Sequence, residues 1–168
     1  MAKYAQQKTR IAIPRGFSKS QRDEIGLAIL DFIVQRDIGH NTNKKGRSYA
    51  KYTDAYAKEK GVSKSDVTLD ATGSMHDNME VLKTYSNYIT IGYDTDYSGM
   101  GKVEGNRKGT YGQKTAVTKP RDFLGITKKD LNSIIKQFKR DEKRALREES
   151  VANEASQLNE AQLKALEN

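Results

Sequence analysis

The sequence contains no cysteine, no tryptophan and only 2 prolines. Without cysteine, the chain can hold neither a disulfide framework nor a thiolate metal site. No stretch approaches the roughly 18 consecutive apolar residues that a membrane-spanning helix needs. The polar N-terminal segment also lacks the apolar core of a signal peptide. We therefore expect neither a membrane partner nor a secretory leader.

Apolar residues are scarce as well. Hydrophobic types make up 35% of the 168 residues, and charged types make up 31%. The length suits one domain of ordinary size. The small apolar fraction implies either that part of the chain is disordered or that it buries surface against partner subunits.

The formal net charge of +8 is distributed unevenly along the chain. Residues 1–60 carry a net charge of +7 and residues 61–120 a net charge of zero, whereas residues 121–147 carry +5 and residues 148–168 carry −4. A basic region is most often a solvated surface, but it also suits a polyanion such as nucleic acid. Three tyrosines lie among these bases, and their spacing favours one buried helix face over base stacking: Tyr49, Tyr52 and Tyr56.

Two helices are expected in the first third of the chain. Ser18 and Gln21 form a capping box that begins a helix, which Gly39 should end. Its apolar side chains are numerous enough that we expect cover on two sides. A second helix is expected over residues 49–60 and should end at Gly61.

A third helix is expected near the C-terminus. Thr127 and Asp130 supply its N-cap chemistry, and residues 139–149 are able to extend it. Residues 148–168 are expected to form an acidic, weakly helical tail. The sequence thus predicts a single α+β domain over residues 1–147, followed by that tail.

Residues 88–93 alternate between apolar and polar types and give the clearest strand signal. They are expected to form a hairpin with residues 75–84, and residues 9–15 are able to add a short edge strand. Residues 94–119 are rich in glycine and threonine, so we expect a long loop or arm. The predicted fold is therefore a small antiparallel sheet packed by two to three helices, with an arm and a helical C-terminal extension.

No catalytic, cofactor-binding or metal-ligating set stands out in the sequence. The two histidines, His40 and His76, lie in turn-like contexts and are expected to be exposed. Residues 94–99 match the start of an EF-hand calcium loop but lack the later glutamate, so a turn is the better interpretation. The glycine-rich run 105–115 never yields the Gly-Lys-Ser/Thr of a P-loop. We expect no enzyme activity, no metal and no cofactor.

Two motifs carry more information than the composition. Asp70-Ala-Thr-Gly-Ser-Met75 precedes the expected hairpin, and Pro120-Arg-Asp-Phe-Leu-Gly-Ile126 leads directly into the Thr127 cap. Together with the segment Tyr49-Ala-Lys-Tyr-Thr-Asp-Ala-Tyr56, they resemble the tail-completion or virion-morphogenesis proteins of tailed bacteriophages. That family includes neck and head–tail joining proteins, and the resemblance extends over roughly residues 10–147.

The resemblance implies a structural subunit of a neck or tail-completion ring built from six copies. Such a homo-oligomer joins portal, adaptor or head-completion proteins to tail-tube and tail-terminator proteins. Genomic double-stranded DNA passes through it without its sequence being read. The implied location is the neck or tail region of the virion, after synthesis in the bacterial host cytoplasm. The alternative is a small basic protein that binds nucleic acid non-specifically.

The resemblance also implies a set of structural and interface residues, namely Thr72, Gly73, Met75, Arg121, Phe123, Leu124, Gly125, Ile126 and Thr127. Phe123 and Leu124 are expected to fill a core or a subunit pocket, and Gly125 to turn the chain with a positive φ. The candidate basic residues beside a DNA passage are Lys44, Lys45, Arg47 and Lys51.

Overall fold

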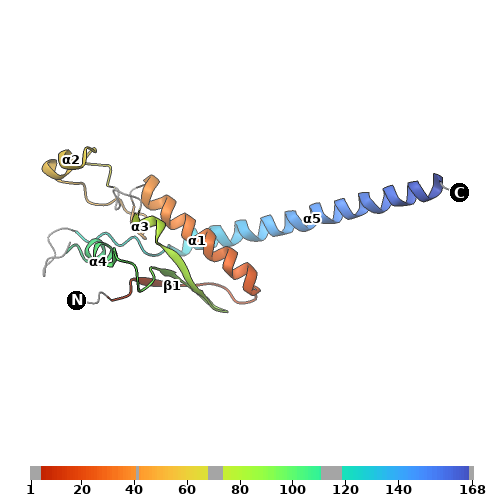
Figure 1. The fold of residues 1–168 in the computed structure, drawn as a ribbon, viewed down its shortest axis with the longest axis horizontal. Coiled ribbons are helices and arrows are strands. Elements are labelled where there is room, and N and C mark those ends of the chain that lie inside the picture. The colour runs from red at the N-terminus through yellow and green to blue at the C-terminus, as the bar shows by residue number, and fades with distance from the viewer. Residues whose placement is uncertain (1–4, 41, 68–73, 111–118, 167–168) are drawn as a thin grey trace. The chain divides into compact units, whose positions relative to one another are not determined.

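The computed structural model describes residues 5–40, 42–67, 74–110 and 119–166. The fold is α+β, as predicted, and its elements follow one another along the chain as β1 (Lys8–Ala12), α1 (Lys19–His40), α2 (Asp54–Lys60), α3 (Ser74–Asp77), β2 (Glu80–Thr84), β3 (Tyr88–Gly92), α4 (Met100–Lys108) and α5 (Lys128–Leu166) (Figure 1). The chain divides into two compact units, residues 1–131 and residues 132–168. Across the ranges given above, no helix combines the length and apolarity needed to cross a membrane.

The sheet has three antiparallel strands in the order β1-β3-β2. The central strand places Ile89 opposite Ile11 of β1 and Ile91 opposite Val81 of β2, so apolar side chains meet across both pairings. The predicted hairpin is confirmed, with a register shift between Val81 and Lys83. It begins later than expected because the short helix α3 occupies residues 74–77.

Strand β1 approaches the end of β3 so closely that only glycine fits there. A Cβ built on Gly92 would lie 2.3 Å from the backbone oxygen of Gln7, well inside van der Waals contact. The amide of Tyr93 donates to that same oxygen at 3.1 Å, within the ordinary range of a backbone hydrogen bond. Gly92 therefore lets β1 extend the sheet.

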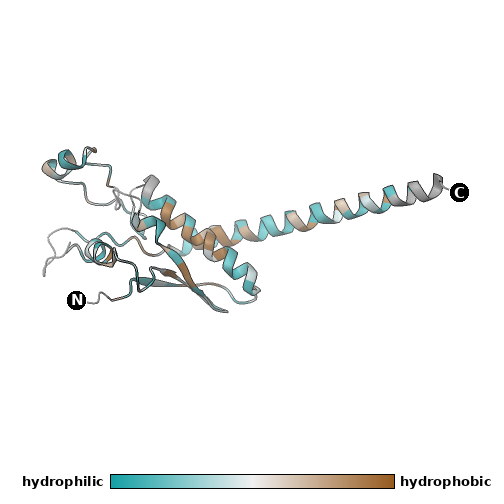
Figure 2. Cartoon of the chain, in the orientation of Figure 1, coloured by the Kyte–Doolittle hydropathy of each residue, from teal (hydrophilic) through white to brown (hydrophobic). Residues whose placement is uncertain are grey.

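Helix α1 packs on β2 and β3 through a stripe of isoleucines. Ile25, Ile29 and Ile33 have no exposed surface, and their i, i+4, i+8 spacing places them on one face of the helix. A Cβ on Gly26 would lie 3.1 Å from Cγ1 of Val81, so glycine permits close packing on the sheet. Figure 2 shows hydrophobic colour gathered on α1 and sparse on α5. Leu27 is exposed, so the expected cover on a second side is not present at that position.

The start of α1 is capped as the sequence predicts. The Ser18 amide donates to Oε1 of Gln21 at 2.7 Å, and the Gln21 amide donates to Oγ of Ser18 at 3.2 Å. This reciprocal pair is a capping box. The predicted end at Gly39 is wrong, because α1 continues to His40.

Helix α2 is shorter than predicted. It begins at Asp54 because Oγ1 of Thr53 caps it by accepting from the Tyr56 amide at 3.3 Å. Gly61, at φ +67°, ends the helix as expected. Tyr49 and Tyr52 precede the helix, so the predicted single helical face of three tyrosines does not form.

Part of the expected 94–119 arm is a helix. Helix α4 covers residues 100–108, and Gly109 ends it with φ +72°. Its glycines disfavour a helix by about 1 kcal/mol each relative to alanine, yet Met100 and Val103 are buried and supply tertiary packing. Residues 111–118 of the expected arm lie outside the described residues.

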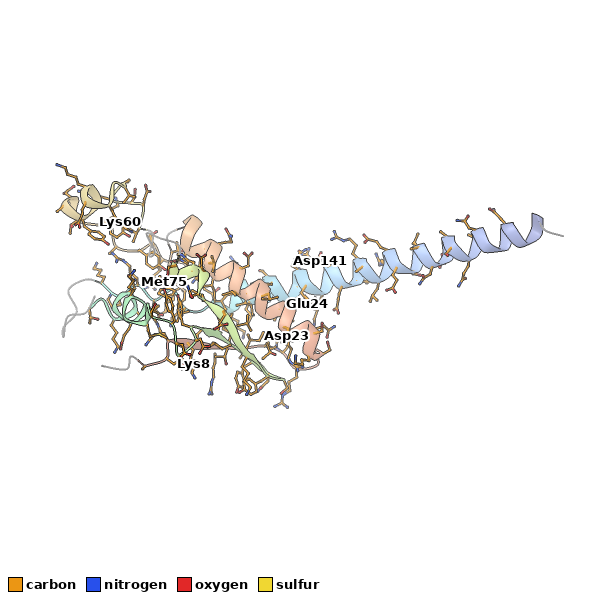
Figure 3. The ribbon with its side chains drawn as sticks, in the orientation of Figure 1. Lys8, Asp23, Glu24, Lys60, Met75 and Asp141 are labelled. Carbon is orange, nitrogen blue, oxygen red and sulfur yellow. The ribbon has the colours of Figure 1, made fainter. Side chains whose placement is uncertain are left out.

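Helix α5 begins with the predicted cap. The Asp130 amide donates to Oγ1 of Thr127 at 3.1 Å, and that hydroxyl donates to Oδ2 of Asp130 at 2.6 Å. The helix continues without interruption to Leu166, through the segment expected to be a weakly helical tail. Figure 3 shows side chains beyond Asp141 standing out on both sides of the helix. The domain bounds predicted from the sequence stay a prediction.

Candidate functional site: two hollows beside residues 119–122

A tight loop over residues 42–48 carries three of the predicted basic residues. Oδ1 of Asn43 accepts from the amides of Lys45 at 2.9 Å and Arg47 at 3.1 Å. Thr42 and Ser48 pair across the base of the loop, and Gly46 adopts φ +71° at its tip. Because the asparagine side chain holds the loop from inside, Lys45 and Arg47 project to solvent on an ordered backbone.

The loop is attached to the segment that contains the Phe-Leu-Gly motif. The Lys44 amide donates to the backbone oxygen of Asp122 at 2.9 Å, and Nζ of Lys44 lies 2.5 Å from Oδ2 of Asp122. On the other side, the Arg121 amide donates to the backbone oxygen of Asn106 in α4 at 2.8 Å. Residues 121–122 are therefore held between the loop and α4.

Arg36 of α1 fixes the rest of the motif. Its Nη1 donates to the backbone oxygen of Gly125 at 2.8 Å, and its Nη2 donates to that of Phe123 at 2.5 Å. Burial lowers the pKa of the Arg36 guanidinium below its ordinary value. Phe123 and Leu124 are fully buried, and Gly125 has φ +131°. This segment is a clamped turn into α5.

A hollow of about 550 Å³, which we call the tyrosine hollow, lies on one side of this segment. Its lining is mostly apolar and comes from two stretches of chain, with the residues Ala50, Lys51, Tyr52, Thr53, Tyr56, Lys119 and Arg121. The rings of Tyr52 and Tyr56 meet edge to face with centroids 5.0 Å apart. Cζ of Arg121 lies 5.3 Å from the Tyr52 centroid, a cation–π distance. The hollow therefore offers aromatic surface with a basic rim.

A second hollow of about 310 Å³, the loop hollow, has a mostly polar lining. It is lined by Asn43, Lys44, Lys45, Arg47, Pro120 and Asp122. Residues 119 and 121 line the tyrosine hollow, whereas residues 120 and 122 line the loop hollow. This alternation is that of an extended chain. Residues 119–122 thus form a wall that the two hollows share.

The surface around both hollows carries positive charge with little compensation. Asp122 lies between two cations, 2.5 Å from Nζ of Lys44 and 3.4 Å from Nε of Arg107. Lys45, Arg47 and Lys51 are exposed and form no ion pair with the part of the chain that the structure describes. The arrangement suits anionic groups such as phosphates or carboxylates.

The structure contains a buried hydrogen-bond network of His76, Asp37 and Tyr49 that the sequence did not predict. His76, expected to be exposed, is only 7% exposed. Its Nε2 lies 2.6 Å from Oδ2 of Asp37, and the Tyr49 hydroxyl donates to Oδ1 of Asp37 at 2.5 Å. Burial and the neighbouring Asp37 raise the pKa of Tyr49 above its ordinary value. These hydrogen bonds connect α1, α3 and the segment before α2.

The other predicted residues fall in several places. Met75 is buried in α3, Ile126 is half-buried and Thr127 caps α5. Thr72 and Gly73 lie outside the described residues, so their expected turn stays a prediction. The structure brings the four predicted bases and Arg121 to adjoining surfaces. Sequence reasoning missed Lys119 and Asn106, which have no local pattern to mark them.

The segment that begins like a calcium loop forms a turn before α4. Oδ1 of Asp94 accepts from the Thr95 amide at 2.5 Å, a local hydrogen bond within the turn. Among the residues that the structure describes, no three acidic or histidine side chains gather to hold a metal ion. Comparisons with family models, with curated proteins and with solved structures found no match to the chain.

Proposed function

We propose that this protein is a structural subunit of a bacteriophage neck or tail-completion ring. In this role it joins the head connector to the tail tube and surrounds the passage of genomic double-stranded DNA. The observation that carries the proposal is the clamped turn of residues 121–125, which places the family-like motif between α1, α4 and the basic loop. The buried side chains of Phe123 and Leu124 and the two carbonyls that accept from Arg36 hold this turn in place, which supports an architectural role.

The basic surface supports a role beside DNA. Lys45 and Arg47 stand on a loop held by Asn43, and their charges are not paired within the described chain. Such cations contact phosphates without reading bases, which is what a DNA passage requires. The loop hollow therefore faces the DNA in the proposed ring.

The ring itself is tested with the purified full-length protein, alone and mixed with tail structures. We expect mass photometry and negative-stain electron microscopy to show closed rings of about six copies, the number that the resemblance implies, because heterologous contacts form a ring when their rotation closes. A protein that stays monomeric and never joins tails would contradict the proposal.

The second candidate is a small basic protein that binds nucleic acid non-specifically, and the unpaired cations of the loop favour it. Under either function, the Lys45→Ala/Arg47→Ala variant should lower the slope of log affinity against log salt by about 2, because each lost phosphate contact removes about 0.9. Lys58→Ala, which removes an exposed lysine of α2, is the matched control. Strong duplex binding by a protein that never forms rings would favour this candidate. A salt slope that is unchanged in Lys45→Ala/Arg47→Ala would show that the loop does not contact phosphates under either function.

A further inference from the structure

The second half of α5 carries an apolar stripe that nothing covers in the described chain. Val151 and Leu158 are 65% and 62% exposed. They are seven residues apart, so they lie on the same helix face, with Ala155 between them. Glu148 and Glu154 flank the stripe at spacings of three and four residues, and residues 148–168 carry a net charge of −4. The stripe is therefore apolar with acidic edges.

The tyrosine hollow has the complementary character. Its lining is mostly apolar, its volume of about 550 Å³ is large enough for several aliphatic side chains, and Tyr56 is 45% exposed at its edge. Lys51, Lys119 and Arg121 belong to its lining, and Lys51 forms no ion pair with the described residues. A ligand that matches it has apolar side chains between carboxylates.

We propose that the acidic half of α5 from one copy of this chain docks in the tyrosine hollow of a second copy. Leu158 and Val151 would enter the hollow, while Glu154 would pair with the lysines of its rim. The opposite charges of the two surfaces argue for this occupant. Because the two surfaces differ, the contact is heterologous and repeats around a ring when the rotation closes. The inference rests on the proposed ring function and names the contact that holds neighbouring subunits together.

The first test compares two leucines of the same helix. Leu158→Ala should shift the assembly toward smaller species at a fixed concentration, measured by sedimentation velocity. Leu146→Ala is the matched control, because Leu146 is equally exposed at 66% but lies in the basic half of α5. Equal effects of the two substitutions, or no effect of either, would overturn the docking.

A charge exchange tests the rim of the hollow. Glu154→Lys and Lys51→Glu should each weaken assembly, and the double variant should recover part of it because the attraction is restored with reversed signs. Both residues are exposed, so the variants are expected to fold. Double-variant assembly no better than that of the single variants would contradict the pairing.

Cross-linking then reports the contact directly, since the chain has no cysteine of its own. Copies carrying Ala155→Cys are mixed with copies carrying Thr53→Cys, so that every mixed disulfide joins two different molecules. We expect a mixed dimer band, and a much weaker one when Ala145→Cys replaces Ala155→Cys.

The outcomes separate this inference from the ring proposal. A wild-type protein that never assembles overturns both. Rings that survive Leu158→Ala and give no mixed disulfide overturn the docking and leave the ring standing. If Tyr56→Ala weakens duplex binding while the rings persist, the hollow serves nucleic acid and the docking is wrong.

Discussion

Residues 1–131 and residues 132–166 are stabilised in different ways. In the first unit, β3 and α1 bury isoleucines completely, and side chains such as Arg36 join segments that are far apart in the sequence. In the second, the helix shows exposed Leu146, Val151 and Leu158, and its described polar contacts are local. The nitrogen Nε2 of Gln137 donates to Asp141 at 2.8 Å, for example, across one helical turn. Such pairs contribute only about 0.2–0.5 kcal/mol each.

The two units use the scarce apolar residues differently. A small core takes the isoleucines of α1 and β3 together with Phe123, whereas α5 buries Ile135 but keeps Leu146, Val151 and Leu158 at the surface. Propensity and local pairs alone leave a helix marginally stable, and most of the stability of helices in proteins comes from packing. The second unit is therefore the part of the chain from which partner contacts are expected.

The largest effect should come from truncation in the first unit. Phe123→Ala removes a fully buried ring and should lower the free energy of unfolding by about 3–5 kcal/mol. Leu146→Ala in the second unit should change it by less than about 0.5 kcal/mol. Urea denaturation of both variants checks this contrast, and similar losses would show that the two regions are not stabilised differently.

A smaller loss of stability is expected when one hydrogen bond of the buried Tyr49–Asp37–His76 network is removed. Tyr49→Phe removes the hydroxyl that donates to Asp37 and should cost about 1–3 kcal/mol at neutral pH. The pKa of Tyr49 is raised in the folded state, so above about pH 10 the unfolded chain loses its proton first and wild-type stability falls. Phenylalanine does not titrate, and the gap between the two proteins should therefore narrow as the pH rises.

The control is Tyr56→Phe, which removes the hydroxyl of an exposed tyrosine and should change the free energy of unfolding by less than about 0.5 kcal/mol. Urea midpoints measured along this pH series supply the comparison. A gap for Tyr49→Phe that stays constant or widens would contradict the assigned role.

The smallest expected change in stability comes from the same alanine-to-glycine substitution made once in each unit, which compares the two units directly. Ala28→Gly on the exposed side of α1 should lower the global free energy of unfolding by about 1 kcal/mol, the ordinary helix-propensity difference. The same change at Ala152 in α5 should leave the global value nearly unchanged and speed only local amide exchange. Hydrogen exchange with mass spectrometry resolves the two segments. A global loss from Ala152→Gly would show that α5 unfolds together with the core.

Local chemistry made several elements predictable. The capping box at Ser18, the Thr127 cap and the alternation of residues 88–92 depend on near neighbours in the sequence, and these elements form as predicted. Helix α4 was missed because its glycines oppose the packing of Met100 and Val103, which only the folded chain supplies. The predicted extent of α2 was wrong because Thr53 caps the helix and begins it at Asp54, whereas the tyrosine spacing had predicted a start at residue 49.

The candidate site was predictable only in its charges. The basic residues of loop 42–48 could be identified by composition, but the hollows need residues 119–122 to lie beside them. His76 was placed wrongly because its partner Asp37 is 39 residues away. No periodic pattern in the sequence reports a single buried polar contact across that separation.

The shared wall of residues 119–122 has a thermodynamic consequence. An occupant that shifts Lys119 and Arg121 in the tyrosine hollow also shifts Pro120 and Asp122 in the loop hollow, because the four residues are one extended stretch. Occupancy of the two hollows is then linked, and by reciprocity each changes the affinity of the other by the same factor. In an assembly built on the proposed contacts, binding of an anionic ligand in the loop hollow would therefore raise or lower the affinity between neighbouring subunits.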